Sequence, residues 1–127
     1  MKVLALDFGS ARTGVAVSDP TGAIARPLCV VKRADIEEIV TIARDQQVSE
    51  IVVGHPLTLR GDRGEQARVT ERFAAKLRKA VDVPVVLFDE RFTTDLAQQT
   101  PSDTSEDARA AAHLLSSYLE WSAASGR

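Results

Sequence analysis

Apolar residues in the first part of the chain fall into three short stretches, at positions 3–7, 14–17 and 23–31. Residues that favour turns separate the last two stretches, in the Asp-Pro-Thr-Gly sequence at 19–22. Short apolar stretches in such close succession are typical of strands joined by tight connections. The pattern therefore predicts an antiparallel meander of three strands at the start of the chain.

The spacing of apolar residues changes after Asp35, where helical periodicity begins. Asp35 is suited to cap this helix, with Glu38 three residues later as its reciprocal partner. The apolar face of the predicted helix consists of Ile36, Ile39, Val40 and Ala43.

Two further strands alternate with helical segments. The first is predicted at 51–53, where Gly54 and Pro56 end it, and a loop rich in Gly and Arg follows at 57–64. The second, at 83–88, is largely apolar, which is typical of a central, parallel strand that is covered on both faces. The helix between them is marked by Phe73, Ala74, Leu77 and Val81.

The end of the chain predicts a short helical stretch at 94–99, a loop at 100–103 and one more helix. An antiparallel start followed by parallel crossovers predicts an α/β fold, with a mixed five-stranded sheet flanked by helices. We expect a single domain over 1–121 and a frayed tail at 122–127. The apolar face of the last helix consists of Ala108, Ala111, Ala112, Leu115 and Leu119.

The composition, with 44% hydrophobic and 27% charged residues, suits one globular domain of 127 residues. The chain shows neither an apolar run of membrane-spanning length nor a signal peptide, and its single cysteine, Cys29, excludes an internal disulfide. We therefore expect a cytoplasmic protein without a membrane partner. The net charge of −2 counts mildly against nucleic acid, although basic residues outnumber acidic ones between Arg60 and Lys79.

Acidic residues stand where α/β folds place their chemistry. Asp7 ends the first strand, Asp89 and Glu90 end the last strand, and Asp107 begins the last helix. The first and last strands can be neighbours in this order, which would bring Asp7 and Glu90 together. Because neighbouring strand residues face opposite sides, only one of Asp89 and Glu90 points into such a site. Asp107 has an equal alternative as a helix-capping residue with Thr104.

Clustered carboxylates repel one another unless a cation offsets their charge. Mg²⁺ favours oxygen ligands and is usually bound by a few carboxylates together with a substrate phosphate. Such ions activate water and stabilise the leaving oxygen during phosphodiester hydrolysis. The chain offers only His55 and His113 for chemistry based on histidine, and neither lies in a recognisable triad, so a metal mechanism suits the residues present.

The loop that follows Asp7 contains Gly9 and Gly14. Glycine lets a backbone approach a phosphate closely, but a hairpin turn requires the same residues. Both interpretations of this loop remain open from the sequence.

Taken together, these segments resemble the YqgF/RuvX family, which is RNase H-like and related to the Holliday junction resolvases. The resemblance covers nearly the whole chain. It is carried by four ordered motifs: residues 6–19, residues 53–56 with Gly61 and 66–67 behind them, residues 89–94, and residues 107–111 leading to 118–119.

The resemblance implies a nuclease that depends on Mg²⁺ or Mn²⁺, with Asp7, Glu90 and Asp107 as catalytic carboxylates and metal ligands. It also implies phosphate contact or orientation by Arg12, Arg91 and Thr93, while Arg91 has an equal alternative as a structural partner of Asp89.

The chain departs from the family pattern between the Asp-Glu-Arg motif and the last helix, where a longer, basic stretch is usual. Residues 97–105 are short here and contain no basic residue, which removes positive charge beside the proposed site. The basic segment that starts at Arg60 is a candidate to compensate by binding nucleic acid, although a solvated helix face is the commoner outcome for such a segment.

The family resemblance implies processing of the 5′ end of pre-16S rRNA or resolution of Holliday junctions. The expected partners are pre-rRNA or branched DNA, together with ribosomal particles, for a monomer or a homodimer. A second hypothesis is a non-catalytic module that binds RNA or the ribosome. A third is a phosphotransferase of the sugar-kinase or actin type, which shares the Asp7-Phe8-Gly9 loop but needs two domains.

Overall fold

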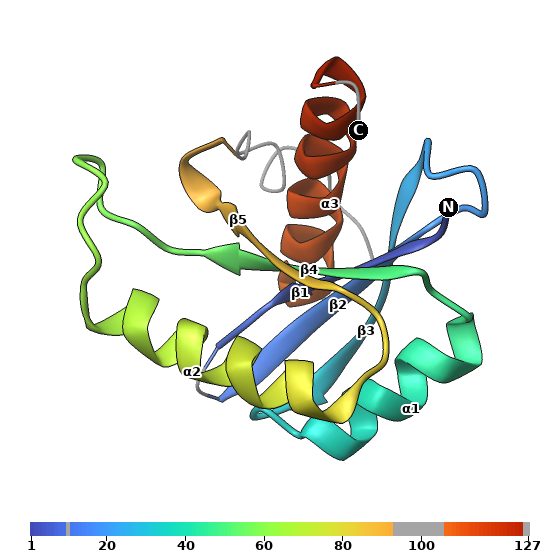
Figure 1. Ribbon diagram of the computed structural model, residues 1–127, viewed down its shortest axis with the longest axis horizontal. Helices are drawn as coiled ribbons and strands as arrows, with labels where there is room; N and C mark the ends of the chain where they lie inside the picture. The colour runs from blue at the N-terminus through green and yellow to red at the C-terminus, as the bar shows by residue number, and fades with distance from the viewer. Residues whose placement is uncertain (10, 93–105, 126–127) are drawn as a thin grey trace.

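The computed structural model describes residues 1–9, 11–92 and 106–125. Its centre is a five-stranded sheet in the order β3-β2-β1-β4-β5 (Figure 1). The strands are β1 (Val3–Asp7), β2 (Arg12–Ser18), β3 (Ala25–Lys32), β4 (Glu50–His55) and β5 (Val85–Asp89). The helices are α1 (Ile36–Gln46), α2 (Glu65–Ala80), α3 (Glu106–Ala124) and the 3₁₀ turn η1 (Glu90–Phe92).

The strand directions confirm the mixed sheet predicted from the sequence. The first three strands form an antiparallel meander, and β4 and β5 are added in parallel on the far side of β1. The prediction of a central fifth strand is wrong, because β4 pairs with β1 and leaves β5 at the edge. The apolar sequence of β5 has another cause: Leu87 packs with α1 and α2 on one face, and Phe88 packs with α3 on the other.

Helices cover both faces of the sheet. Figure 1 shows α1 and α2 together on one side and α3 crossing the other. The layer beneath α1 and α2 is built from large aliphatic strand residues such as Leu4, Leu6 and Val53. The layer beneath α3 contains smaller strand residues, including Ala5 and Ala16. Alternate residues of each strand therefore belong to two separate cores.

The start of α1 confirms Asp35 as its N-cap. Asp35 Oδ1 accepts a hydrogen bond from the backbone N–H of Glu38 at 3.2 Å, which satisfies one of the free donors of the first turn. The helix ends at Gln47, whose positive φ of 55° lets its N–H reach the carbonyls of Ala43 and Arg44.

The last helix is longer than expected, since α3 continues through Ala124 and includes residues 122–124 of the predicted tail. Packing of Trp121 against Phe88 and Tyr118, with ring centroids 5.8 and 5.9 Å apart, holds this part of the helix on the protein. The helix predicted at 94–99 and the capping residue Thr104 lie outside the described residues. Within the part of the chain that is described, no helix is both long and apolar enough to cross a membrane.

Candidate active site

The strand register places Asp7 between two glycines in a row across the sheet. Asp7 pairs with Gly14 of β2, and Leu6 pairs with Val53 of β4, so the same register brings Asp7 opposite Gly54. Asp7 lies two residues beyond Ala5, which packs against α3, so its side chain belongs to the face that α3 covers. The site is therefore built at the carboxyl end of β1, on the α3 face.

Gly14 allows α3 to begin directly above the sheet. A Cβ at this position would overlap the backbone carbonyl of Asp107, in the first turn of α3. The helix start carrying Asp107 therefore lies against the strand next to Asp7. The backbone of α3 approaches Gly14 closely, which explains this glycine without a bound phosphate. At Gly9 a Cβ would lie 2.5 Å from the carbonyl of Arg12, which supports the hairpin interpretation of this loop.

Gly54 gives room to Glu90 in the same way. A Cβ on Gly54 would lie 2.5 Å from Glu90 Oε1, so the Glu90 carboxylate occupies the space above β4, next to β1. Asp7 and Glu90 come together through this arrangement, although the strands that precede them are not neighbours. The prediction that β1 and β5 adjoin is wrong, and the absence of a side chain at Gly54 is what lets Glu90 reach across β4.

Asp89 faces away from this site and forms an ion pair with Arg91. The distance from Arg91 Nη2 to Asp89 Oδ2 is 2.6 Å, and hydrogen bonds from Arg91 lower the pKa of the Asp89 carboxyl group. Arg91 Nη1 also donates to the carbonyl of Leu59 at 3.3 Å. The structure therefore favours Glu90 as the inward acid and Arg91 as a structural partner of Asp89, the alternative left open by the sequence.

The electrostatics of the site reflect burial and mutual repulsion. Burial, and then the charge of Asp107, raise the pKa of Asp7. Burial raises the pKa of Glu90 to about 7, and the charges of Asp7 and Asp89 add to this effect. Asp7 and Glu90 therefore resist ionisation while neighbouring carboxylates are charged, and a bound cation would relieve that repulsion.

Asp107 already has a cationic partner in the ion pair between its Oδ2 and Arg12 Nε, at 2.9 Å. Arg12 remains 67% exposed. Within the described residues, no group of three or more histidine, cysteine, aspartate or glutamate side chains is arranged to hold a metal ion. The structure thus brings Asp7, Glu90 and Asp107 into one neighbourhood, but they do not form a closed ligand set. Their all-oxygen chemistry fits a hard cation such as Mg²⁺ or Mn²⁺.

The sequence also predicted contacts with nucleic acid for Arg60 and Thr93. Arg60 is exposed in the loop between β4 and α2, one residue after Leu59. The contact of Arg91 with the Leu59 carbonyl therefore holds this loop beside η1. Thr93 lies outside the described residues.

A second set of interactions, which the sequence analysis missed, holds the other end of this loop. Arg63 donates to Glu71 through Nε at 2.9 Å and Nη2 at 2.5 Å, and His55 Nε2 lies 2.6 Å from Glu71 Oε2. Hydrogen bonds from Arg63 and then His55 lower the pKa of Glu71 to about 2. These contacts give His55 a structural role.

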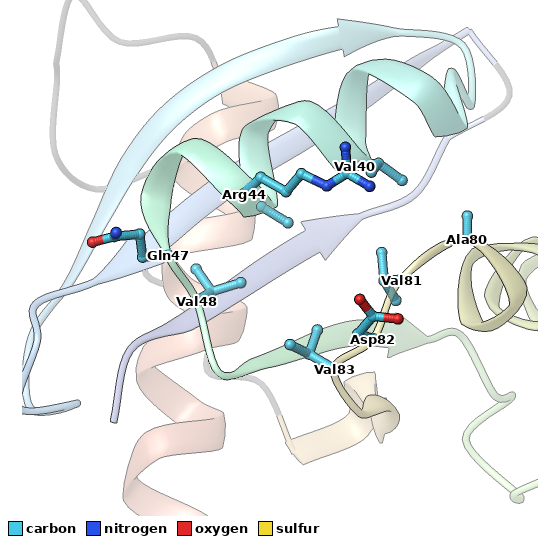
Figure 2. Close-up of a pocket in the computed structure, with 9 residues that line it drawn as sticks. Val40, Arg44, Gln47, Val48, Ala80, Val81, Asp82 and Val83 are labelled. Carbon is cyan, nitrogen blue, oxygen red and sulfur yellow. The ribbon is translucent and has the colours of Figure 1, made fainter.

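A hollow of about 150 Å³ lies at the opposite end of the sheet, between α1 and the segment that enters β5 (Figure 2). Figure 2 shows the aliphatic side chains of Val48, Val81 and Val83 around it, with Arg44 and Asp82 also at its edge. It lies near the amino ends of β4 and β5, whereas Asp7 and Glu90 lie at the carboxyl ends. It therefore forms no part of the carboxylate site.

The mixed five-stranded sheet with helices on both faces defines the class of protein, an RNase H-like domain. The chain is similar to Thermus thermophilus RuvC in complex with a Holliday junction substrate, with a TM-score of 0.69, 15% sequence identity and coverage of 99% of this chain and 97% of that one. A second Thermus thermophilus RuvC structure gives a TM-score of 0.59 at 16% identity, covering 95% and 96%.

The family follows from sequence. The model of the family described as RuvX, Holliday junction resolvase, matches residues 1–121, and the chain belongs to this family. A relative from Roseiflexus sp. (strain RS-1) is 42% identical over 106 residues, covering 80% of this chain and 75% of its own. One from Sulfurihydrogenibium sp. (strain YO3AOP1) is 38% identical over 130 residues, covering 94% and 90%. Both carry the provisional name pre-16S rRNA nuclease.

Proposed function

We propose that this chain is a divalent-metal-dependent endonuclease in which Asp7, Glu90 and Asp107 are the catalytic carboxylates. The observation that carries the proposal is the placement of Glu90 over Gly54, beside Asp7, with the start of α3 on the other side. Burial and the neighbouring carboxylates raise the pKa of both Asp7 and Glu90. Evolved active sites often show such shifts, and a stable core has no need of them.

Asp7, Glu90 and Asp107 would hold Mg²⁺ or Mn²⁺ together with a phosphate of the substrate, which is how Mg²⁺ is usually bound in proteins. The ion would supply the positive charge that activates a water molecule and stabilises the leaving oxygen. Asp7 is fixed by the sheet, and Glu90 is carried on η1. Arg12 neutralises Asp107 and keeps an exposed guanidinium at the rim of the site, where it can meet a phosphate.

We propose pre-16S rRNA as the substrate, with cleavage at its 5′ end, because relatives at 38–48% identity carry that name. Resolution of a Holliday junction is the second candidate, since structures of the same fold include complexes with that DNA. Pre-16S rRNA would bring the chain to ribosomal particles in the cytoplasm. In either case Arg60 would contact the nucleic acid backbone, and its exposure in the loop that Arg91 holds beside η1 supports this.

The test is cleavage of a pre-16S rRNA leader and of a four-way DNA junction by the purified chain, with Mg²⁺, with Mn²⁺ and with a chelator. We expect metal-dependent cleavage, with the RNA cut faster. Asp7→Asn and Glu90→Gln preserve shape but remove a charge, and each should lower the rate by about a thousand-fold. The matched control is Asp45→Asn on the exposed surface of α1, which should cleave like the unmodified chain.

Cleavage that survives Asp7→Asn at full rate would show that another nuclease causes the activity. RNA binding that is independent of metal, with no cleavage under any of these conditions, would instead favour the non-catalytic binding module.

A further inference from the structure

A cluster of four aromatic rings lies beside the candidate active site, on the face of the sheet that α3 covers. Phe88 stands at its centre, with ring centroids 5.4 Å from Tyr118, 5.8 Å from Trp121 and 5.9 Å from Phe92. The two inner members are core residues, since Phe88 and Tyr118 are only 4% and 1% exposed. The two outer members are different: Phe92 is 59% exposed and Trp121 is 41% exposed.

The exposed pair borders one surface hollow, which Ser117 and Glu120 also line. Single exposed hydrophobic residues are common on protein surfaces and need no explanation. Two large exposed rings at the same hollow, with a hydroxyl and a carboxylate at its edge, form instead a site with flat apolar walls and polar groups. We call Phe92 and Trp121 the aromatic site.

The aromatic site is a close neighbour of the carboxylates. Phe88 pairs with Gly54 across β4 and β5, and Gly54 lies next to Asp7 in the row across the sheet. Since adjacent strands are about 4.8 Å apart, the backbones of Asp7 and Phe88 are about 10 Å apart. Phe92 follows Glu90 by two residues within the same 3₁₀ turn. A nucleic acid strand cut at the carboxylates would therefore reach the aromatic site within a few nucleotides.

The residues that line the hollow favour binding of a nucleobase over binding of a phosphate. Aromatic side chains bind nucleobases by stacking, which tolerates any sequence because every base has a flat face. Glu120 repels phosphate, while its carboxylate is suited to accept hydrogen bonds from the edge of a base. A paired base has its faces covered within the duplex, so only an unpaired base fits.

We propose that Phe92 and Trp121 form a stacking site for an unpaired nucleobase a few nucleotides from the bond that is cut. This inference rests on the proposed nuclease function and narrows its substrate to strands that are single-stranded beside the cleavage point. The arrangement divides recognition between two neighbouring regions, with the carboxylates and Arg12 facing the backbone and the aromatic site facing a base.

Trp121 is the only tryptophan of the chain, so its fluorescence reports directly on the aromatic site. The probe is an eight-nucleotide single-stranded RNA, titrated into the protein with a chelator present to prevent cleavage. We expect it to quench the fluorescence, while a blunt duplex of the same length and an oligonucleotide of abasic residues leave the fluorescence almost unchanged. Phe92→Leu retains an apolar side chain but removes the ring, and should weaken binding about 5- to 150-fold.

Ile24→Ala is the matched control, because Ile24 is an exposed hydrophobic residue of the β2–β3 hairpin, 69% exposed. It should bind the probe as the unmodified chain does. Thermal unfolding of Phe92→Leu verifies that the variant is folded. Equal affinity for the single strand and the duplex, or full affinity in folded Phe92→Leu, would overturn the stacking site.

These experiments test the stacking site and the nuclease function separately. If Asp7→Asn abolishes cleavage while Phe92→Leu binds and cleaves normally, the nuclease stands and the stacking site is refuted. If the chain never cleaves but quenching depends on the Phe92 ring, the stacking site stands without the nuclease.

Discussion

The two faces of the sheet are built from different residues. Beneath α1 and α2 the strands present leucine, isoleucine and valine, which fill the space between the layers and are almost fully buried. Beneath α3 the same strands present Ala5, Ala16, Gly14 and Gly54, and the acid Asp7. The small residues let α3 and Glu90 approach the sheet, so that charged groups lie on the α3 face beside buried residues such as Val52 and Phe88.

We infer from this difference that the α1–α2 face mainly stabilises the fold, whereas the α3 face also positions the groups of the candidate site. A face of large aliphatic residues gains free energy from every buried methyl group and can be changed without touching a charged atom. On the α3 face, the glycines and alanines gain less from burial than leucine or valine would, but they let backbone and carboxylate groups come close together. We therefore expect substitutions on the α1–α2 face to change stability alone, and substitutions on the α3 face to change cleavage as well.

Leu77→Ala is the strongest test of the first half of this comparison. Leu77 is fully buried on α2, and its truncation leaves a cavity that should lower the free energy of unfolding by about 2–5 kcal/mol. The cleavage rate, measured well below the lowered melting temperature, should stay within about three-fold of normal, because no charged group moves. A large loss of cleavage by the folded variant would mean that the two faces are not independent.

Gly14→Ala is the corresponding change on the α3 face. The new methyl group overlaps the carbonyl of Asp107, so α3 must shift, at a cost of about 1–3 kcal/mol in the free energy of unfolding. Cleavage should fall together with stability, because the shift carries Asp107 away from Asp7. Denaturant unfolding and the cleavage assay measure the two effects.

Gly54→Ala is its matched control. There the methyl group meets only the flexible end of Glu90, so cleavage should fall while stability changes less than in Gly14→Ala. An unchanged cleavage rate in both glycine variants would contradict the proposed arrangement.

The smallest expected effect is a pH-dependent change in stability that Glu90 causes. It is measured with a chelator present. The pKa of Glu90 is raised from 4.5 to about 7, so folding favours the protonated form. This contribution is fully present below about pH 4.5 and is lost as the pH rises through about 7. Glu90→Gln should therefore be more stable than the unmodified chain at pH 8, by about 1–2 kcal/mol after allowance for solvent screening, and equal to it near pH 4.

The matched variant is Glu37→Gln, which makes the same substitution at an exposed site on α1. Thermal unfolding at each pH is the measurement. Added Mg²⁺ should stabilise the unmodified chain above pH 7 and have little effect on Glu90→Gln. If the difference in stability between Glu90→Gln and the unmodified chain were the same at every pH in this range, the raised pKa of Glu90 would be contradicted.

Much of the fold was predictable because local signals carried it. The Asp-Pro-Thr-Gly turn at 19–22 predicted the meander, Asp35 predicted the start of α1, and its place at the end of the first strand made Asp7 a candidate site residue. The place of β5 was not predictable, because an apolar strand covered on both faces has the same sequence at an edge as at the centre. What decides its place is the pairing of β4 with β1.

The sequence pointed to the candidate residues of the site but not to their geometry. The choice between Asp89 and Glu90 depends on Arg91 turning back to Asp89, a contact between residues two apart that sequence spacing does not determine. The functions of Gly14 and Gly54 depend on which groups lie above them, and both groups come from distant parts of the chain. Phe92 and Trp121, 29 positions apart, become neighbours only through α3.

The central place of β1 has a consequence for how the site resists local opening. Ladder hydrogen bonds hold β1 to β2 and β4, and Val3 to Leu6 are fully buried, so their amide hydrogens are expected to exchange with solvent only when the whole domain unfolds. Glu90 follows an edge strand, and Asp107 stands in the first turn of a helix, where exchange is usually faster. Asp7 is thus the most rigidly held acid of the site. We expect Glu90 and Asp107 to make any movement that accommodates a bound substrate.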